Sequence, residues 1–435
     1  MGSVTIGPAS HPLRGTFTVP GDKSIAHRAL LLGAVARGPT LVRGFAGGED
    51  NRATLDACRL LGVAGVESGT EVRIDGRGWD GLAPPPSTID CRNSGTTMRL
   101  LTGLLAGRPF TSRLDGDASL RRRPMRRVLE PLSRMGAAIV SEGADGHAPL
   151  RIDGRVLHGA AHTLAVASAQ VKSALLLAGL QAAGETRVEE PAPSRDHTER
   201  LLGAFGATLT RGARSVAVRG PQELAGTAVE LPGDFSSAAF LIVAALLVRG
   251  SELRLVDVGV NPTRTGLLEA LDAMGAEITV EPAEVSGTDE PRASLLVRGA
   301  ELRATRVAGE LLLRAVDEFP ILCIAAACAD GATELRDAGE LRVKESDRIA
   351  VMAETLRTLG VRVSELSDGL VIEGPSRFTG GRIDARGDHR IAMAAAVAGL
   401  ASRDGVTILG AECADVSFPG FYAVLAGAAG GAAVL

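Results

Sequence analysis

Several short polar segments of the sequence carry side chains that could bind anions and move protons. The cationic members are Lys23, Arg28, Arg99, Arg121, Arg122, Arg123, Lys172, Arg195, Lys344, Arg348 and Arg390. Two carboxylates, Asp317 and Glu345, stand among these cations. Cations suit phosphate and carboxylate groups, and a carboxylate beside them suits proton transfer. The pattern predicts an enzyme that acts on two anionic substrates.

Each of these features also has a simpler interpretation. A pair such as Lys23-Ser24, taken alone, is more often solvated surface than a site, and residues 121–127 are compatible with a solvent-exposed face. His389 is compatible with a buried histidine near a helix cap. Lys23-Ser24 does not form a P-loop, because G-x-x-x-x-G-K-[ST] is absent. No G-x-S-x-G, H-E-x-x-H or G-x-G-x-x-G motif occurs in a usable context.

The polar residues stand where Ala/Leu-rich helices should begin. The six opening segments are GDKSIAHR from Gly21, RNSGTTMR from Arg92, SAQVKS from Ser168, GDFSSA from Gly233, DEFP from Asp317 and GDHRIA from Gly387. Asp22 and Asp234 have the character of N-caps. A helix N-terminus presents free N–H groups and a positive dipole end, so it favours an anion. We therefore expect several helix starts to form one anion-binding region.

An internal repeat predicts how these helices are arranged. The segment VPGDKSIAHRALLLGAVARG from Val19 resembles LPGDFSSAAFLIVAALLVRG from Leu231, which indicates that the second half copies the first. Within each half, a helix, a glycine and a short strand recur; these strands begin at Gly38, Gly107, Gly184, Gly250, Gly331 and Gly405. Second helices end in an apolar residue and a glycine, at Gly62, Gly136, Gly206, Gly275 and Gly360. The unit is βαβαββ, present six times, with the sixth copy degenerating into the C-terminus.

Composition excludes several classes of protein. A chain of 435 residues is long enough for two domains. A net charge of −4 and an aromatic content of 3% argue against nucleic-acid binding. The five cysteines form no C-x-x-C pair, so neither a zinc site nor a redox motif is predicted. The apolar runs are too short to span a membrane and no signal core opens the sequence, so we expect a soluble cytoplasmic protein.

Eight motifs in order carry a specific resemblance. They are PGDKSIAHRALLLGA, NSGTTMRLL, RRRPM, ASAQVKSALLLAGL, SRDHTERLL, VDEFPIL, VKESDRI and GDHRIAMAAAVAGL. Together they resemble the 5-enolpyruvylshikimate-3-phosphate (EPSP) synthases, the 3-phosphoshikimate 1-carboxyvinyltransferases of the shikimate pathway. The resemblance extends from about residue 10 to residue 422.

The resemblance implies an α/β fold, a two-domain inside-out α/β barrel with three βαβαββ repeats per domain and the active site in the cleft between the domains. One domain would comprise residues 1–20 and 233–435 and the other residues 21–232, with crossings near 19–22 and 231–234. The implied partners are the small molecules phosphoenolpyruvate and shikimate 3-phosphate. No metal, organic cofactor, nucleic acid or membrane is expected, and the protein is expected to be a monomer.

The resemblance also assigns roles to individual residues. Asp317, Glu345 and Lys23 would be catalytic, with Asp317 accepting the proton of the attacking 5-hydroxyl and Glu345 serving proton transfer at the phosphoenolpyruvate methylene. The residues implied for shikimate 3-phosphate are Lys23, Ser24, Arg28, Ser168, Ala169, Gln170, Arg195, Asp317 and Lys344. Those implied for phosphoenolpyruvate are Lys23, Gly95, Arg123, Gln170, Arg348 and Arg390. The reaction would proceed by addition and elimination through a tetrahedral intermediate.

Three positions depart from the family pattern. Ala169 stands where many members have a second serine, and His197 where many have tyrosine. Val416 replaces a lysine that many members use on phosphoenolpyruvate, which weakens the predicted cation count. Glyphosate occupies the phosphoenolpyruvate site of many members, and Gly95 leaves room for it, so sensitivity is expected.

Two other functions would explain part of this pattern. Enolpyruvyl transfer to UDP-N-acetylglucosamine occurs on the same fold, but that family resembles Lys-Asn rather than Lys23-Ser24 at its first helix and has a cysteine in a cleft loop. Residues 121–125 contain none. A non-catalytic anion-binding repeat protein would explain the cations but leave Asp317 and Glu345 without a purpose, because bare acids weaken anion binding.

Overall fold

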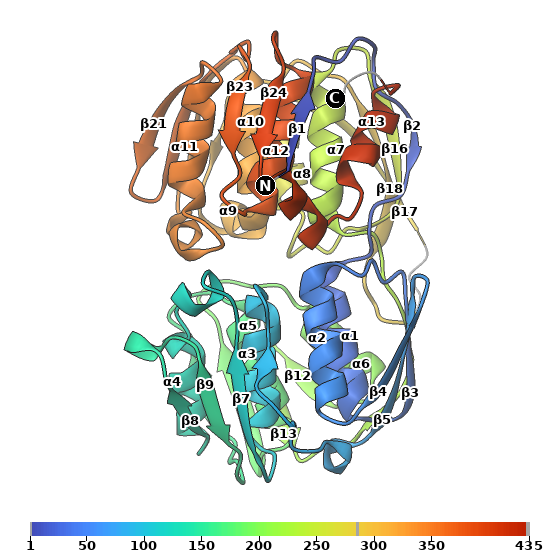
Figure 1. Ribbon diagram of the computed structural model, residues 1–435, viewed down its shortest axis with the longest axis vertical. Coiled ribbons are helices and arrows are strands. Elements are labelled where there is room, and N and C mark those ends of the chain that lie inside the picture. The colour runs from blue at the N-terminus through green and yellow to red at the C-terminus, as the bar shows by residue number, and fades with distance from the viewer. Residues whose placement is uncertain (1, 284–286, 432–435) are drawn as a thin grey trace. The chain divides into compact units, whose positions relative to one another are not determined.

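The structure of the protein is a computed structural model, and it describes residues 2–283 and 287–431. The chain divides into two compact units, which can be followed by residue number in Figure 1. Unit 1 holds the described residues of the ranges 1–20, 232–284 and 291–435, and unit 2 holds residues 21–231 and 287–290.

This division differs from the predicted domain boundaries at two places. Pro232 belongs to unit 1 and residues 287–290 belong to unit 2, whereas the prediction assigned each to the other domain. Contacts of Glu290 explain the second difference, because its Oε1 lies 2.7 Å from Nδ1 of His197, a residue of unit 2, and both side chains are buried. Residues 1, 284–286 and 432–435 of the predicted domain lie outside the described residues.

Unit 2 is built from three repeats. The first runs through α1 (Lys23–Val35), β3 (Ala36–Arg43), α2 (Glu49–Leu60), β4 (Ala64–Ser68) and β5 (Glu71–Arg77). Strands β3 and β4 each pair with β5 in antiparallel register. The other two repeats follow the same order through α3 (Gly95–Leu105), β7 (Thr111–Asp115), α4 (Arg126–Arg134), β8 (Ala138–Ser141) and β9 (Leu150–Asp153), then α5 (Ala169–Gly179), β11 (Gly184–Glu189), α6 (His197–Ala204), β12 (Leu209–Arg211) and β13 (Ser215–Gly220).

Unit 1 contains the corresponding elements. Its first two repeats are α7 (Phe235–Leu247), β16 (Glu252–Gly259), α8 (Gly266–Ala273), β17 (Glu277–Pro282) and β18 (Arg292–Arg298), then α10 (Phe319–Cys328), β20 (Gly331–Leu335), α11 (Arg348–Thr358), β21 (Arg362–Leu366) and β22 (Gly369–Gly374). The last repeat keeps α12 (His389–Leu400), β24 (Val406–Leu409) and a short α13 (Phe421–Ala428). Strand β1 (Ser3–Ile6) pairs with β24 in antiparallel register, so the N-terminus supplies a strand to this last repeat. The predicted α/β fold of six repeats is confirmed.

Each repeat also has a leading strand that pairs in parallel with the strand after its first helix. Four of these are β6 (Ile89–Asp90), β10 (Ala161–Thr163), β19 (Arg306–Val307) and β23 (Gly381–Asp384). The other two are exchanged. Strand β2 (Arg14–Phe17) precedes α1 in sequence but pairs with β16 of unit 1, and β15 (Ala228–Glu230) precedes α7 but pairs with β3 of unit 2. The chain therefore leaves each unit immediately after adding a strand to it.

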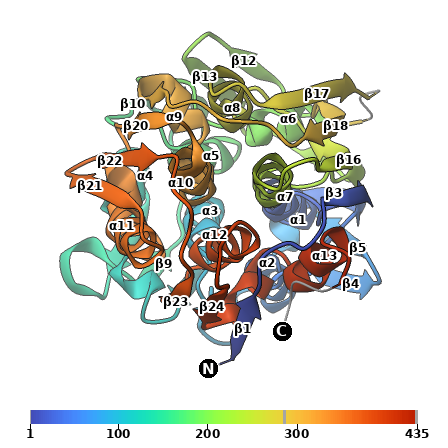
Figure 2. The ribbon, with the colours of Figure 1, turned by 90° about the horizontal axis from the view of Figure 1, so that it is seen from above.

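The first helices of the repeats form the interior of each unit. In unit 1, α7, α10 and α12 gather at the centre, with the sheets around them (Figure 2). All residues of α12 and nearly all of α7 and α10 are buried, as expected for helices that are apolar on every side. In unit 2, α3 and α5 pack side by side (Figure 1). The charged side chains of these helices lie in their N-terminal halves, so the fold places charged groups near the helix starts.

The residues predicted to cap and to end the helices are found at those places. The side chain of Asp22 accepts a hydrogen bond from the backbone N–H of Ile25, and Asp234 accepts one from Ser236, which confirms both as N-caps. The glycines predicted to end the second helices all have φ between 82° and 93°, a region that glycine adopts without strain; they are Gly62, Gly136, Gly206, Gly275 and Gly360.

Candidate active site

The first turn of α1 places Lys23 beside an acidic partner. Its Nζ lies 2.9 Å from Oδ2 of Asp50, the second residue of α2, and both side chains are mostly buried. The backbone carbonyl of Lys23 accepts a hydrogen bond from Nδ2 of Asn51 at 3.0 Å. The predicted catalytic lysine is thus held at both its backbone and its ammonium group by the start of α2, and the sequence analysis did not anticipate Asp50.

Arg28 lies one turn further along α1 and is buried. Its Nε donates to Oγ1 of Thr198, one terminal nitrogen donates to Oγ of Ser173, and the other donates to the carbonyl oxygen of Ser24, at 2.6 to 2.9 Å. Burial lowers the pKa of Arg28 to about 10, with Glu199 opposing this shift and Arg195 adding to it. The guanidinium therefore remains charged at neutral pH, and its neighbours orient it chiefly through neutral oxygen atoms.

The start of α3 brings two further arginines together at Gly95. Ser94 caps this helix by accepting a hydrogen bond from the backbone N–H of Thr97. A Cβ atom at Gly95 would lie 2.6 Å from a guanidinium nitrogen of Arg99 and 3.2 Å from one of Arg123, so the missing side chain leaves space beside two buried cations. Arg99, one of the cations named from the sequence, belongs to this group although the family resemblance assigned it to neither substrate.

The start of α5 is connected to α3 through Gln170. The Oε1 atom of Gln170 accepts from Arg99 at 2.7 Å, and its Nε2 atom donates to Oγ1 of Thr96 at 2.9 Å. Ser168 is the N-cap residue of α5 and Ala169 its first residue, and all three predicted residues are partly exposed. Gln170 is therefore held in place by the residues that follow Gly95.

Lys172 differs from the other cations of the predicted group. Its Nζ lies 2.7 Å from Oε2 of Glu190 and 2.8 Å from Oε1 of Glu199, and the side chains are about 5% exposed. Burial alone would lower the pKa of Lys172, but Glu199 and Glu190 outweigh it and raise the pKa. The expectation that Lys172 adds charge for an anion is wrong, because its charge is neutralised inside the protein.

Two arginines of unit 1, Arg348 and Arg390, lie near Asp317, which belongs to the short 3₁₀ turn Val316–Glu318 before α10. A terminal nitrogen of Arg348 is 3.6 Å from Oδ1 of Asp317, and one of Arg390 is 3.7 Å from Oδ2. Another nitrogen of Arg390 donates to the backbone carbonyl of Asp317 at 2.8 Å and lies 3.8 Å from a carboxylate oxygen of the buried Glu318. Asp317 itself keeps 17% of its side chain exposed, so a substrate can reach it.

Arg348 is buried among three carboxylates. Its Nε lies 2.9 Å from Oδ2 of Asp388, the N-cap residue of α12, and a terminal nitrogen lies 2.7 Å from Oε2 of Glu345. Burial disfavours its charge, but Asp388 and Glu345 more than compensate, so the pKa of Arg348 is raised. Burial also raises the pKa of Asp388, yet Arg348 outweighs burial and holds that pKa below its usual value. Asp388 thus acts on Arg348 as well as capping α12.

Three further positions, Lys344, Arg195 and Val416, are partly exposed. Lys344 Nζ lies 3.2 Å from Oε1 of Glu340, with about a quarter of each side chain exposed. Arg195 is partly exposed just before α6, and its charge acts on Arg28. Val416 closes a short 3₁₀ turn (Ala411–Val416) after β24 and is partly exposed.

The predicted residues fall into two groups. The unit 2 group lies at or near the starts of α1, α3, α4, α5 and α6 and comprises Lys23, Ser24, Arg28, Gly95, Arg123, Ser168, Ala169, Gln170 and Arg195. The unit 1 group lies at the starts of α10, α11 and α12 and comprises Asp317, Lys344, Glu345, Arg348 and Arg390. The residues that the sequence analysis missed are Asp50, Glu318 and Asp388. Glu318 and Asp388 stand in the helix starts DEFP and GDHRIA, whereas Asp50 belongs to none of the quoted motifs.

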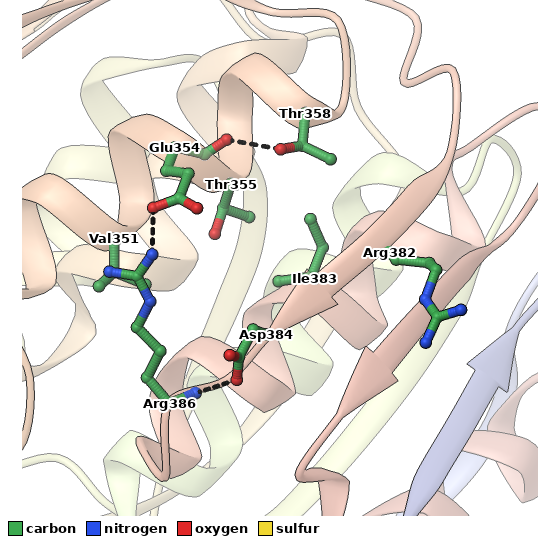
Figure 3. Close-up of a pocket in the computed structure, with 8 residues that line it drawn as sticks. All are labelled: Val351, Glu354, Thr355, Thr358, Arg382, Ile383, Asp384 and Arg386. Carbon is green, nitrogen blue, oxygen red and sulfur yellow. Dashed lines mark hydrogen bonds and ion pairs between the residues drawn. The ribbon is translucent and has the colours of Figure 1, made fainter.

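A small surface pocket of unit 1 lies apart from both groups. It lies between α11 and β23 (Figure 3) and is lined by Val351, Glu354, Thr355, Thr358, Arg382, Ile383, Asp384 and Arg386. Arg386 pairs with Glu354, and its backbone N–H donates to Oδ1 of Asp384 at 2.8 Å. None of the predicted residues lines it, so it is not part of the candidate active site.

Within residues 2–283 and 287–431, no group of three or more His, Cys, Asp or Glu side chains could hold a metal ion. The same part of the chain contains no helix that is long and apolar enough to cross a membrane. All five cysteines are free, and the pKa of Cys58 is raised to about 12 by burial.

Comparison with known proteins gives a consistent result. The sequence model of the family EPSP synthase (3-phosphoshikimate 1-carboxyvinyltransferase) matches residues 8–425. The 3-phosphoshikimate 1-carboxyvinyltransferase of Geobacter metallireducens is 55% identical over 98% of this chain and 99% of its own. That of Halorhodospira halophila is 56% identical over 95% of this chain and 93% of its own.

Solved structures are similar over the same length. An EPSP synthase from Acinetobacter baumannii has a TM-score of 0.88 and 46% identity, covering 100% of this chain and 99% of that one. The enolpyruvyl transferase NikO from Streptomyces tendae has a TM-score of 0.79 at 20% identity, covering 100% and 98% of the two chains, which shows a shared fold. The chain therefore belongs to the EPSP synthase (3-phosphoshikimate 1-carboxyvinyltransferase) family.

Proposed function

We propose that this chain transfers the enolpyruvyl group of phosphoenolpyruvate to the 5-hydroxyl of shikimate 3-phosphate and releases inorganic phosphate. The observation that carries the proposal is the grouping of the predicted residues at helix starts in each unit, in a chain of this family. One group is rich in cations and the other combines arginines with carboxylates. The first property suits binding of phosphate and carboxylate groups, and the second suits proton transfer.

The proposed reaction balances without a cofactor. A proton adds to the methylene carbon of phosphoenolpyruvate, and the 5-hydroxyl oxygen bonds to the adjacent carbon while losing its own proton. The resulting tetrahedral adduct then expels phosphate and loses a proton from its methyl group, which gives the enol ether. Asp317 would take the hydroxyl proton and Glu345 would serve the methylene, and the 17% and 21% exposure of their side chains leaves both accessible.

Shikimate 3-phosphate is proposed to bind mainly through the unit 2 group. Arg28 and Arg195 would supply charge, and Ser24, Ser168 and Gln170 would supply hydrogen bonds. This assignment is supported by the bonds that hold Arg28, because a guanidinium oriented by neutral partners keeps its charge for a ligand. Ala169 lacks the hydroxyl that many members have, so its backbone N–H at the start of α5 would contribute instead. The remaining contacts would come from Lys23, Asp317 and Lys344.

Phosphoenolpyruvate is proposed to bind beside Gly95, where the arginines of α3 and its neighbouring loop meet. Arg123 and Lys23 would contact it from unit 2, together with Gln170. Arg348 and Arg390 would contact it as well, which requires residues of both units to act on one substrate. Because Val416 provides no cation, Arg99 is a candidate for part of the missing charge, as its guanidinium lies next to Gly95.

The direct test is phosphate release by the purified protein. Phosphoenolpyruvate plus shikimate 3-phosphate should give phosphate in equal amount to the enol ether product, and neither substrate alone should. Release that depends on UDP-N-acetylglucosamine instead would establish the rival transferase activity. No release with either acceptor would favour a binding protein.

We also propose that the enzyme works as a monomer in the cytoplasm. Five free thiols are in keeping with a reducing compartment. Light scattering at the concentrations used for activity would report the oligomeric state, and a dimer mass would contradict this part of the proposal.

A further inference from the structure

A chain of four buried side chains crosses three helices of unit 2. Nδ1 of His27 on α1 lies 2.7 Å from Oγ1 of Thr54 on α2. That oxygen lies 2.7 Å from Oγ1 of Thr97 on α3, which donates to Oγ of Ser94 at 2.7 Å. All four residues are 0 or 1% exposed, so no water competes for these bonds. The mechanism above uses none of these side chains.

Both ends of this chain reach residues of the candidate active site. At one end, Ser94 also accepts the backbone N–H of Thr97 at 3.1 Å and so fixes the turn that begins with Gly95. At the other end, His27 lies one helical turn after Lys23, on the same face of α1. Helix α2 connects the two, because Asp50 and Thr54 are one turn apart on it and contact Lys23 and Thr97 respectively.

The hydrogen bonds run in one direction. Thr97 has a single hydroxyl proton, and its two acceptors are Ser94 Oγ at 2.7 Å and the Asp50 carbonyl at 3.4 Å. Thr97 must therefore accept from Thr54, and Thr54 must accept from Nδ1–H of His27. This direction places a proton on Nδ1 of His27.

The surroundings of His27 agree with a neutral ring. Its Nε2 has no hydrogen-bond partner among the described residues, which a lone pair tolerates better than a buried N–H would. Burial lowers the pKa of His27 to about 3; Asp50 opposes this shift, and Lys23 and Arg28 add to it. The imidazole is thus a fixed donor and does not exchange protons at neutral pH.

The internal repeat shows that the fold does not require an imidazole here. In the matching segment of unit 1, Ala239 takes the place of His27, and it is also fully buried at the first helix of its repeat. The imidazole is therefore particular to unit 2 and is not a feature of the repeat. Lys23 and Arg28 of the same helix start also differ, because Phe235 and Phe240 take their places in unit 1.

We infer that His27 is a positioning residue for the transfer reaction, whose Nδ1–H orients the Thr54–Thr97–Ser94 chain and so sets the first turn of α3 against Lys23. The inference rests on the proposed function, in which Gly95 and Lys23 both bind phosphoenolpyruvate. The side chain touches no substrate. Its loss should therefore misplace the phosphoenolpyruvate contacts more than those of shikimate 3-phosphate, whose main anchor is Arg28.

The test compares three variants of the purified enzyme. His27→Leu removes the donor and should raise KM for phosphoenolpyruvate about tenfold, the loss expected for one buried hydrogen bond. KM for shikimate 3-phosphate should change by less than about twofold. His27→Asn keeps an N–H near the position of Nδ1 and should restore most of the KM. His162→Leu is the matched control, because His162 is a buried histidine of unit 2 whose ring nitrogens have no hydrogen-bond partner among the described residues.

A second pair of variants applies if His27→Leu does not fold. Thr54→Val removes the middle hydroxyl at nearly constant shape and should raise the same KM, while Thr54→Ser should not. The shape of the pH–rate profile should stay that of the wild type in all variants. Equal loss in His27→Asn and His27→Leu, equal loss in His162→Leu, or an equal rise of both KM values would overturn the inference. A wild-type enzyme without transferase activity would instead overturn the proposed function.

Discussion

Helices α1 and α7 follow the same P-G-D segment and are capped by the same type of residue. The side chains at three matching positions nevertheless differ, because those of α1 are polar or charged and those of α7 are apolar. Lys23, His27 and Arg28 of α1 correspond to Phe235, Ala239 and Phe240 of α7. Phe240 packs edge-to-face against Phe421 at 5.9 Å between ring centroids, deep in the core of unit 1. The repeat therefore preserves the backbone and its cap, while the side chains that follow decide whether a helix start binds ligands or fills a core.

The two units also treat their arginines differently. In unit 2, hydrogen bonds orient Arg28 and Arg99 through hydroxyl, amide and carbonyl oxygens. In unit 1, Arg348 is paired with three carboxylates. The positive charges of Arg28 and Arg99 in unit 2 are therefore held by neutral partners. In the unit 1 group, the positive charge of Arg348 is matched by carboxylates. This contrast predicts that changes at Arg28 of unit 2 alter substrate binding and that changes at the carboxylate Asp317 of unit 1 alter turnover.

Removal of the central acid of unit 1 should have the largest effect. Asp317→Ala should lower kcat by roughly a thousandfold, the scale expected for a general base, while the protein keeps much of its affinity for both substrates. Steady-state phosphate release measures this. Asp330→Ala, a change of an exposed aspartate of the same unit, is the control. Loss of substrate affinity together with folding would show instead that Asp317 is structural.

Lys172→Met tests the one cation of unit 2 that we assign to stability. The change leaves Glu190 and Glu199 buried without their counter-charge, so the free energy of unfolding in urea should fall by about 3 to 5 kcal/mol. Arg43→Met, which removes two exposed ion pairs with Glu71 and Glu230, should cost much less.

The pH dependence of this effect has a definite sign. Because the folded-state pKa of Lys172 is raised above the ordinary 10.5, its contribution is fully present below that pH and is lost as the pH rises through the folded-state pKa. The stability difference between wild type and Lys172→Met should therefore be constant from pH 6 to about pH 9. A difference that disappears near pH 7 would contradict the assignment.

Arg28→Lys tests whether unit 2 binds shikimate 3-phosphate through this guanidinium. A lysine cannot donate to Thr198, Ser173 and Ser24 at once, so KM for shikimate 3-phosphate should rise by roughly 30-fold while kcat changes little. Arg37→Lys is the control, because Arg37 forms an exposed ion pair with Glu223 on the same unit. A fall in kcat with unchanged KM would reverse the roles assigned to the two units.

Gly95→Ala should have the smallest effect of the series. The added methyl group displaces the ends of two flexible arginine side chains, Arg99 and Arg123, so KM for phosphoenolpyruvate should rise only about threefold to tenfold. The wild type should also be inhibited by glyphosate in competition with phosphoenolpyruvate. Turnover that is unaffected by excess glyphosate would contradict the expectation drawn from Gly95.

The sequence predicted the elements of this fold better than the partners of its side chains. Glycine, aspartate caps and apolar helices recur at regular spacing, so the six repeats and their helix starts could be recognised. The exchanged strands β2 and β15 could not, because local pattern does not say which sheet a strand joins. The neutralisation of Lys172 was also hidden, since Glu190 and Glu199 lie in a loop and a following helix that only tertiary folding brings to α5.

In the candidate site, hydrogen bonds between residues far apart in the sequence could not be predicted either. Arg28 was predicted as a ligand-binding cation from its motif, but its bond to Thr198 joins residues 170 positions apart and is visible only in the structure. His27, in the same motif, appeared as one residue of a helix start. Its partner Thr54 belongs to no motif, so the hydrogen-bonded chain left no signal in the sequence.

The most direct test of the account is turnover in D₂O, followed by mass spectrometry of the product. Addition of a solvent deuteron to the methylene carbon, followed by loss of one hydrogen from the resulting methyl group, should leave deuterium in the vinyl group of the enol ether. This labelling should require shikimate 3-phosphate and should be lost with Asp317→Ala. An enol ether formed at the wild-type rate without deuterium at that carbon would contradict the proposed chemistry.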